Sequence, residues 1–312
     1  MARTRFVPDT GLTVRMTAVM FLLGALFVAL IVGLMYFATA NGGGSGLVLV
    51  IGLVGVGVAF FQWWYSDKAA MRAMRAREVS AEQAPELHGM IDRLCAMADM
   101  PKPRVAIADT SLPNAFATGR SPMRSVVCVT TGILNTLTAE ELEGVLAHEL
   151  SHVAHRDVLV MTVASSAGIV AGMITRFAQF GGLGLGRSRS NNNNNGAGAI
   201  GFFVVLIVSL LVYAFSFVLL RLLSRYRELC ADRSGAYLTQ RPSALASALT
   251  KISGQMNAVP ERDLRAAKPM NAFFIAPAVR GLTLGTLTAT HPPLEQRLDQ
   301  LAKIAASLGQ SH

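Results

Sequence analysis

The sequence predicts a mainly α-helical, polytopic membrane protein with a small β-sheet (α+β). Of its 312 residues, 52% are apolar and only 15% are charged, a composition typical of proteins with membrane spans. The apolar residues are concentrated in long uncharged runs, and the polar segments between them contain β-like runs and helical patterns. We therefore expect membrane helices joined to one soluble domain.

An N-terminal membrane hairpin is predicted over residues 1–65. Its two spans, at about 16–37 and 47–65, are uncharged, and each is long enough to cross about 30 Å of hydrocarbon as a helix. A cleaved signal peptide is the alternative for the first run, but the run exceeds the roughly 7–15 apolar residues of such a peptide. Arginine and lysine occur on both outer flanks and not in the connector, so both flanks are expected in the cytosol.

A second membrane hairpin is predicted over residues 158–222. Residues 200–220 are strongly apolar, whereas 158–175 are only moderately so. A Gly- and Asn-rich segment at 181–199 separates the two spans and is expected to be a loop. This hairpin divides the soluble domain into two parts.

The soluble domain is expected to comprise residues 66–157 and 223–312, which are enough for one core. A helix is predicted near 83–99 in the first part, and the second part has the pattern of helices joined by loops. Three short β-like runs predict the strands of a small sheet. These runs are RVAIAD (104–109), NAFATG (114–119) and SVVCVTTGIL (125–134).

Charge and cysteine content bear on the partners and the compartment. The net charge is +9, but many of the basic residues flank the apolar runs, and there is no aromatic-and-basic stripe of the kind that binds single strands. The expected partner is therefore the lipid bilayer, not nucleic acid. The three cysteines form no C-x-x-C pair and are expected to be reduced, partly buried thiols.

The segment GVLAHELSHVAHRD contains the pattern H-E-x-x-H. A helix is expected here because Thr138 and Glu141 form a capping-box pattern ahead of it. His148 and His152 lie on one face of such a helix and can direct both imidazoles at one ion. Glu149 lies beside the metal, where it can accept a proton from a zinc-bound water.

Two questions remain open for this motif. The two histidines can be a chance pair on a solvated helix face, and the motif alone does not supply the third protein ligand that a catalytic zinc takes. His155 follows on the same face, but three ligands along one straight helix would span about 10 Å of rise, too far to surround one ion. We therefore expect His155 to be a surface or supporting residue.

A third ligand is expected from the segment LLSRYRELCADRSGAYL, directly after the last apolar run. Glu228 can complete a site of two histidines and one glutamate and leave the fourth position to water. Asp232 lies four residues later on the same face and can hold one metal-bound histidine through its outer N–H. The alternative is an ordinary amphipathic helix in which Arg225, Arg227 and Arg233 are solvated charges.

The order of these motifs resembles the HtpX family of membrane zinc endopeptidases, which are relatives of the CAAX prenyl-protein proteases. The resemblance extends over nearly the whole chain, from the N-terminal hairpin through NAFATG, HELSH, SRYRELCAD and THPPLEQR. It implies a zincin-like catalytic domain with one zinc ion per subunit. It also implies His148, His152 and Glu228 as the ligands and Glu149 as the base.

The resemblance implies roles for two further segments. NAFATG would lie along the cleft as an edge strand that pairs with an extended substrate. The residues implied to bind substrate are Asn114, Ala115, Phe116 and Ala117. His291 and Arg297 of HPPLEQR match positions thought to contact the reacting carbonyl. The alternative for HPPLEQR is a helix start, in which the two prolines begin a helix that packs on the core.

Together these inferences predict a multi-pass protein of the bacterial cytoplasmic membrane whose catalytic domain faces the cytosol. His152 and Glu228 must lie on one side of the membrane to meet at one ion, so the two later spans both cross it or neither does. The predicted activity is hydrolysis of peptide bonds in protein substrates, and the resemblance implies quality control of misfolded or damaged membrane proteins. The alternatives are a prenyl-protein processing protease and a membrane scaffold with a structural metal, for which no fourth protein ligand stands out.

Overall fold

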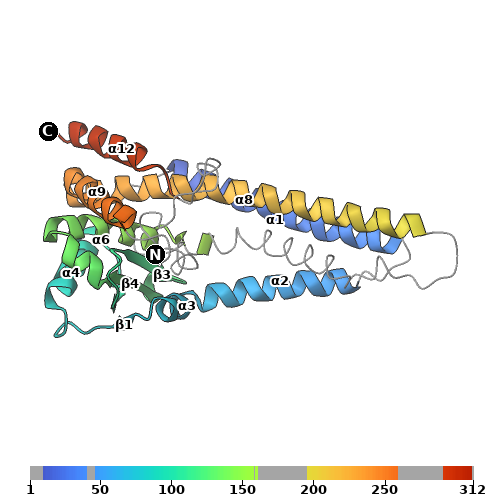
Figure 1. Ribbon diagram of the computed structural model, residues 1–312, viewed down its shortest axis with the longest axis horizontal. Helices are drawn as coiled ribbons and strands as arrows, with labels where there is room; N and C mark the ends of the chain where they lie inside the picture. Colours follow the sequence, from blue (N-terminus) through green and yellow to red (C-terminus); the bar gives the residue numbers. More distant parts are fainter. Residues whose placement is uncertain (1–9, 41–45, 158, 161–194, 259–290, 311–312) are drawn as a thin grey trace. The chain divides into compact units, whose positions relative to one another are not determined.

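The computed structural model describes residues 10–40, 46–157, 159–160, 195–258 and 291–310 (Figure 1). The chain divides into two units. The first, called the mixed unit, comprises Met1–Thr13, Trp63–Leu159 and Arg221–His312. The second, called the helical unit, comprises Val14–Gln62 and Val160–Leu220.

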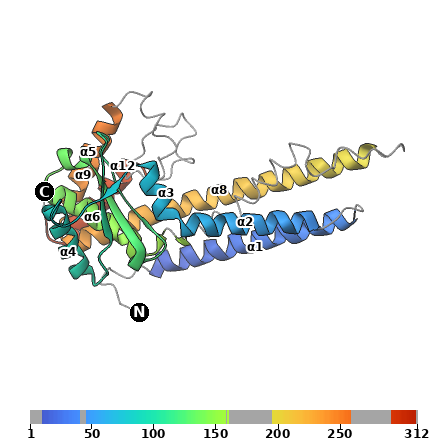
Figure 2. The same cartoon turned by 90° about the horizontal axis from the view of Figure 1, so that it is seen from below.

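Apolar helices build the helical unit. They belong to α1 (Thr10–Ala40), α2 (Gly46–Trp64) and α8 (Asn195–Thr239). Helices α1 and α2 lie side by side (Figure 2), because Gly52 leaves room for the Ile31 side chain. Phe21, Phe60 and Phe203 are exposed, as expected for helices whose solvent is lipid.

The predicted spans agree with these helices where the chain is described. The spans at 16–37 and 47–65 fall on α1 and, to within one residue, on α2, and the span at 200–220 lies inside α8. By length and apolar composition, Thr10–Gly33 and Leu206–Thr239 can cross a membrane.

The predicted loop at 181–199 needs a correction. Helix α8 begins at Asn195, so the last five residues of that segment are helical. None of these five residues is charged in the sequence, and the helix extends back through them. The rest of this loop, and the predicted span at 158–175 apart from the helical residues 159–160, lie outside the described residues.

Among the described residues of the mixed unit, four strands form one sheet, in the order β1-β2-β4-β3. They are β1 (Arg77–Glu78), β2 (Arg104–Ala108), β3 (Ala115–Gly119) and β4 (Ser125–Thr130). Strands β2 and β4 are parallel, whereas β1 and β3 run antiparallel to their neighbours. Within the described part of the chain β3 pairs with β4 alone, so one of its edges is open. The first two predicted strands and the first six residues of the third are confirmed, and β1 is too short to give a periodic signal.

The last predicted strand ends early. SVVCVTTGIL was expected to be strand throughout, but β4 stops at Thr130 and α5 (Thr131–Thr136) begins. The hydroxyl of Thr130 accepts a hydrogen bond from the Ile133 N–H at 3.1 Å and so caps this helix. Gly132 permits the close approach, since a Cβ there would lie 2.3 Å from the Ser111 carbonyl oxygen.

Helices cover both faces of the sheet, which leaves β4 buried along its whole length. In the described part of the mixed unit, the remaining elements are α3 (Ser66–Ala73), α4 (Pro85–Ala98), the short turn η1 (Pro122–Arg124), α6 (Ala139–Ala154), α9 (Pro242–Ala258) and α12 (Leu294–Ser307). Val127 and Val129 point into the main core with α4, α6 and α9. Val126 and Cys128 point to the opposite face, which Ala70 of α3 covers.

Helix α6 is fixed at its start and along its length. The predicted capping box is confirmed: the Glu141 N–H donates to the Thr138 hydroxyl at 3.3 Å, and the Thr138 N–H donates to the Glu141 carboxylate at 2.9 Å. Gly144 lets α9 approach, because a Cβ there would lie 3.3 Å from Leu245. The apolar side chains of this helix are buried in the main core: Leu142, Val145, Leu146, Leu150 and Val153.

Helix α8 packs against α6 at Gly235. A Cβ at this position would lie 3.0 Å from the His148 backbone nitrogen, closer than side chains ordinarily come. Glycine therefore sets the distance between the two helices. As a result, the polar side chains of α8 near this contact face α6.

We expect Glu141→Gln to lower the Tm of the protein in detergent by roughly 2–10 °C at pH 7. Burial alone would raise the pKa of Glu141. Hydrogen bonds from Lys251, Ser247 and the Thr138 N–H together have the larger effect and lower this pKa to about 2. Because the folded-state pKa lies below the ordinary value of 4.5, the carboxylate stabilises the fold above about pH 4.5, and this stabilisation is lost as the pH falls toward 2. The Tm difference between variant and wild type should therefore shrink at pH 3.

The matched control is Glu140→Gln, one position earlier. Glu140 is exposed and pairs with Arg241 at 3.0 Å on the surface, where such a pair contributes little. Its removal should leave the Tm within about 1 °C at both pH values. A Tm deficit of Glu141→Gln that stayed constant from pH 7 to pH 3 would contradict the assignment.

Candidate metal centre

His148 and His152 project from the same face of α6, as their spacing predicts. Their Nε2 atoms lie 3.2 Å apart, and their rings are nearly perpendicular, with centroids 4.8 Å apart. His148 is buried, and 12% of the His152 side chain is exposed. The two nitrogens therefore face one small volume.

Glu228 of α8 brings a carboxylate to the same volume. Its Oε2 atom lies 3.5 Å from His148 Nε2, and its Oε1 atom lies 3.6 Å from His152 Nε2. These three side chains form a group whose possible ligand atoms all lie within 4.8 Å of one another. Within the described residues, His155 is not part of this group. It is the C-cap residue of α6.

Asp232 holds the outer nitrogen of His148. His148 Nδ1 lies 2.9 Å from Asp232 Oδ1, which leaves Nε2 directed at Glu228. Asp232 is completely buried and accepts two hydrogen bonds from the Arg297 guanidinium, at 2.7 Å and 2.6 Å. Asp232 therefore contacts a histidine of the cluster, as its four-residue spacing from Glu228 predicted.

A second carboxylate, not predicted from the sequence, holds His152. Asp157 Oδ2 lies 2.6 Å from His152 Nδ1 and 2.9 Å from the guanidinium of Arg227. Burial alone would raise the pKa of Asp157. Arg227 and His152 together have the larger effect and lower this pKa to about 2, so the carboxylate is ionised at neutral pH. The alternative in which Arg227 is a solvated charge is wrong, because its side chain is buried against Asp157.

The separations between these groups fit one metal ion. In a tetrahedral site with bonds of about 2.0–2.2 Å, two ligand atoms lie about 3.3–3.6 Å apart. Two imidazole nitrogens as close as those of His148 and His152 need a cation between them, either a proton or a metal. Burial alone would lower the pKa of His148. Asp232 and Glu228 together have the larger effect and raise this pKa to about 9, so the surrounding carboxylates favour a positive charge at this position.

Glu149 lies one helical position from His148 and is buried. Its Oε2 atom accepts a hydrogen bond from the Ala117 backbone N–H of β3 at 2.9 Å. Burial raises the pKa of Glu149, and the neighbouring His148 and His152 offset part of that effect. The carboxylate is therefore oriented by the edge strand and can exchange a proton closer to neutral pH than an exposed glutamate.

The segment expected to bind substrate lies at this edge of the sheet. Ala115 and Ala117 belong to β3, and Asn114 precedes it, with its backbone N–H bonded to the Thr130 hydroxyl. The Phe116 side chain packs into the core on the face of the sheet opposite to α6.

The structure brings both predicted residues of HPPLEQR to the cluster. His291 Nδ1 lies 3.1 Å from Glu228 Oε2. Arg297 instead directs its guanidinium at Asp232, and its side chain is 2% exposed. Pro293 is the N-cap residue of α12, so the predicted helix start and the approach to the site occur in one segment.

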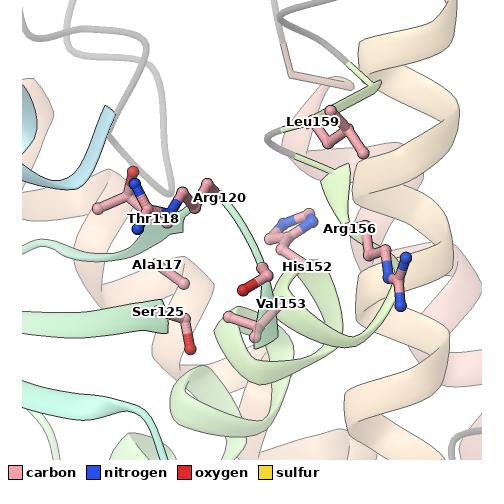
Figure 3. A pocket seen from close by; sticks show the side chains of 10 residues that line it. Ala117, Thr118, Arg120, Ser125, His152, Val153, Arg156 and Leu159 are labelled. Atoms are coloured by element: carbon pink, nitrogen blue, oxygen red, sulfur yellow. The ribbon is translucent and has the colours of Figure 1, made fainter. Parts of the chain in front are cut away.

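A small cavity adjoins His152 (Figure 3). Ala117 and Thr118 of the edge strand line one side of it, and His152 and Val153 of α6 line the other. The open edge of the sheet and one of the two histidines therefore border the same space.

The sequence matches the family described as Peptidase family M48 over residues 81–305. Curated relatives carry protease names. The chain is 52% identical to "Protease HtpX homolog 1" of Streptomyces coelicolor, covering 99% of this chain and 98% of the relative. It is 47% identical to "Protease HtpX homolog 2" of Methanosarcina acetivorans, covering 95% and 96% respectively.

A solved structure shares the fold. The crystal structure of S. mikatae Ste24p matches 93% of this chain with a TM-score of 0.53 and 19% sequence identity. The chain spans 65% of the length of that protein.

We expect Glu228→Ala to lose bound metal as severely as His148→Ala, because each removes an atom that would bind the ion directly. Asp232→Ala should lose less, since it removes only a group that orients a histidine, an effect typically worth about 10–100-fold in affinity. The measurement is metal per mole of purified protein, with folding checked by circular dichroism.

The control is His155→Ala, which changes a histidine of the same helix outside the cluster. Its metal content should equal that of the wild type. Loss of metal from His155→Ala together with retention by Glu228→Ala would overturn the assignment of the third ligand.

Proposed function

The chain belongs to peptidase family M48 and is a membrane metalloprotease of the HtpX type, and from this premise we propose that zinc is its metal and that it cleaves internal bonds of protein substrates. One observation carries the proposal: two imidazoles and one carboxylate converge within 4.8 Å, with a further buried carboxylate, that of Glu149, beside them.

The donor set favours a hydrolytic zinc site over a structural one. A structural zinc usually has four protein ligands, whereas a catalytic zinc has three and an open position. His148, His152 and Glu228 supply three in the described part of the chain. When bound, zinc would polarise the scissile carbonyl and make water a stronger nucleophile at neutral pH.

Glu149 is the proposed general base. It would accept the proton of the attacking water and return it to the leaving amine. The hydrogen bond from Ala117 orients its carboxylate, and the pKa raised by burial brings proton acceptance and return closer to balance at neutral pH. His148 and His152 lie on the same helix as Glu149, so the position of the base relative to a bound ion is fixed.

The substrate would bind as an extended strand along the open edge of β3. The segment from Asn114 to Ala117 would lie alongside it, and the cavity beside His152 would lie next to the bound chain. His291 is the proposed contact of the reacting carbonyl, because it reaches Glu228. For Arg297, the two bonds to Asp232 favour a supporting role over the contact with the carbonyl that the resemblance implied.

We further propose a multi-pass protein of the bacterial cytoplasmic membrane whose catalytic domain faces the cytosol. The uncharged connector after α1 and the basic residues on both outer flanks support this orientation. The resemblance to HtpX proteases supports misfolded or damaged membrane proteins as substrates, cleaved for quality control.

We expect Glu149→Gln to keep zinc and to lose about 10²–10⁴-fold in the rate of proteolysis. The amide is isosteric with the carboxylate and is not one of the three metal-binding groups, but it cannot accept a proton. The measurement is cleavage of an unfolded protein by the purified full-length variant, beside its zinc content.

The control for that experiment is Glu143→Gln on the same helix, which removes an ion pair with Arg93 on the surface. Its rate should equal that of the wild type. Turnover by Glu149→Gln at the wild-type rate, with zinc retained, would show that another group accepts the proton.

The orientation can be tested with single cysteines, since Cys95, Cys128 and Cys230 are buried. A cysteine at Gly42 in the connector should react with an impermeant maleimide in intact cells. A cysteine at Ala73, an exposed residue that ends α3, should react only after lysis. Labelling at Ala73 from outside the cell would exclude a cytosolic catalytic domain.

A further inference from the structure

Asp157 lies three residues beyond the end of α6 and is 1% exposed. Its Oδ2 atom makes the 2.6 Å contact with His152 Nδ1. A carboxylate at this distance accepts the Nδ1–H, which leaves the Nε2 lone pair directed into the cluster. The tautomer and the ring orientation of His152 are therefore set from outside the H-E-x-x-H motif.

Arg227 holds Asp157 in turn. One of its guanidinium nitrogens lies 2.9 Å from the same Asp157 Oδ2 atom that contacts His152. Arg227 immediately precedes Glu228 on α8, so neighbouring residues of one helix reach the histidine pair from two sides. Glu228 reaches the inner nitrogens of both histidines directly, and Arg227 reaches the outer nitrogen of His152 through Asp157.

The arrangement repeats the one around the other histidine. His148 is held by Asp232, and Asp232 is held by the guanidinium of Arg297. In each of these two series of contacts, a buried arginine fixes a buried aspartate, and the aspartate fixes the outer nitrogen of a histidine. Burying these charges is costly unless every partner is present, which favours a role beyond packing.

We propose that Asp157 is a positioning residue for His152 and that Arg227 acts through Asp157 to hold it. Helix α8 then supplies the carboxylate of the cluster and, at the preceding residue, the group that locks the second histidine. The correct register of α8 on α6 sets both at once. This inference rests on the proposed function, in that the cluster binds zinc.

The test is zinc affinity, measured by competition with a chelating dye on full-length protein in detergent. We expect Asp157→Ala to weaken affinity by about 10–100-fold. Asp157→Asn keeps an acceptor for the His152 Nδ1–H and should recover most of the loss. The visible spectrum of the Co²⁺-loaded protein should change in Asp157→Ala and return toward wild type in Asp157→Asn, because it reports the arrangement of the ligands.

A double-mutant cycle tests whether Arg227 acts on His152 through Asp157. Arg227→Met should weaken affinity when Asp157 is present, and the double variant Arg227→Met with Asp157→Ala should lose no more than Asp157→Ala alone. Losses that multiply would show that Arg227 acts independently of Asp157 and would overturn that part of the inference.

Glu141→Gln separates positioning from stability. Glu141 is another buried carboxylate on α6, paired with Lys251 at 2.8 Å and far along the helix from the cluster. It should lower Tm without changing zinc affinity. If the wild type binds zinc and Asp157→Ala binds it as tightly, the inference is wrong. If the wild type binds no zinc, the proposed function itself fails.

Discussion

The contact of α8 with α6 at Gly235 is the constraint on which the candidate metal centre depends. Because no side chain intervenes, the backbone of α8 approaches the His148 nitrogen closely. Glu228 and Asp232, within two turns of that contact, consequently reach the inner and the outer nitrogen of His148. A bulkier residue at Gly235 would separate the helices, and the three candidate ligands could no longer converge.

Charge balance explains why so many ionised groups can be buried together. Two aspartates, Asp157 and Asp232, are matched by Arg227 and Arg297, and these four charges cancel in pairs. What remains at the centre are the carboxylates of Glu228 and Glu149 and the imidazoles of His148, His152 and His291, an environment that favours a cation. The outer pairs thus orient the ligands and leave the inner charge for the ion.

Local patterns in the sequence predicted the parts of the site that lie on one helix. The i, i+4 spacing identified both histidines, the capping box located the start of α6, and the same spacing paired Glu228 with Asp232. Contacts between distant segments were missed. Asp157 and Arg227 are 70 residues apart in the numbering, so neither has a local signal that points to the other. The early end of β4 depends likewise on Thr130 capping a helix within an apolar run that otherwise has the character of a strand.

X-ray absorption at the zinc edge on the full-length protein tests the central claim most directly, since it reports the atoms bound to the metal. The account predicts nitrogen and oxygen ligands at about 2.0–2.2 Å, with the scattering of two imidazoles. A sulfur ligand at about 2.3 Å, or the scattering of three or more imidazoles, would contradict a site built from His148, His152 and Glu228.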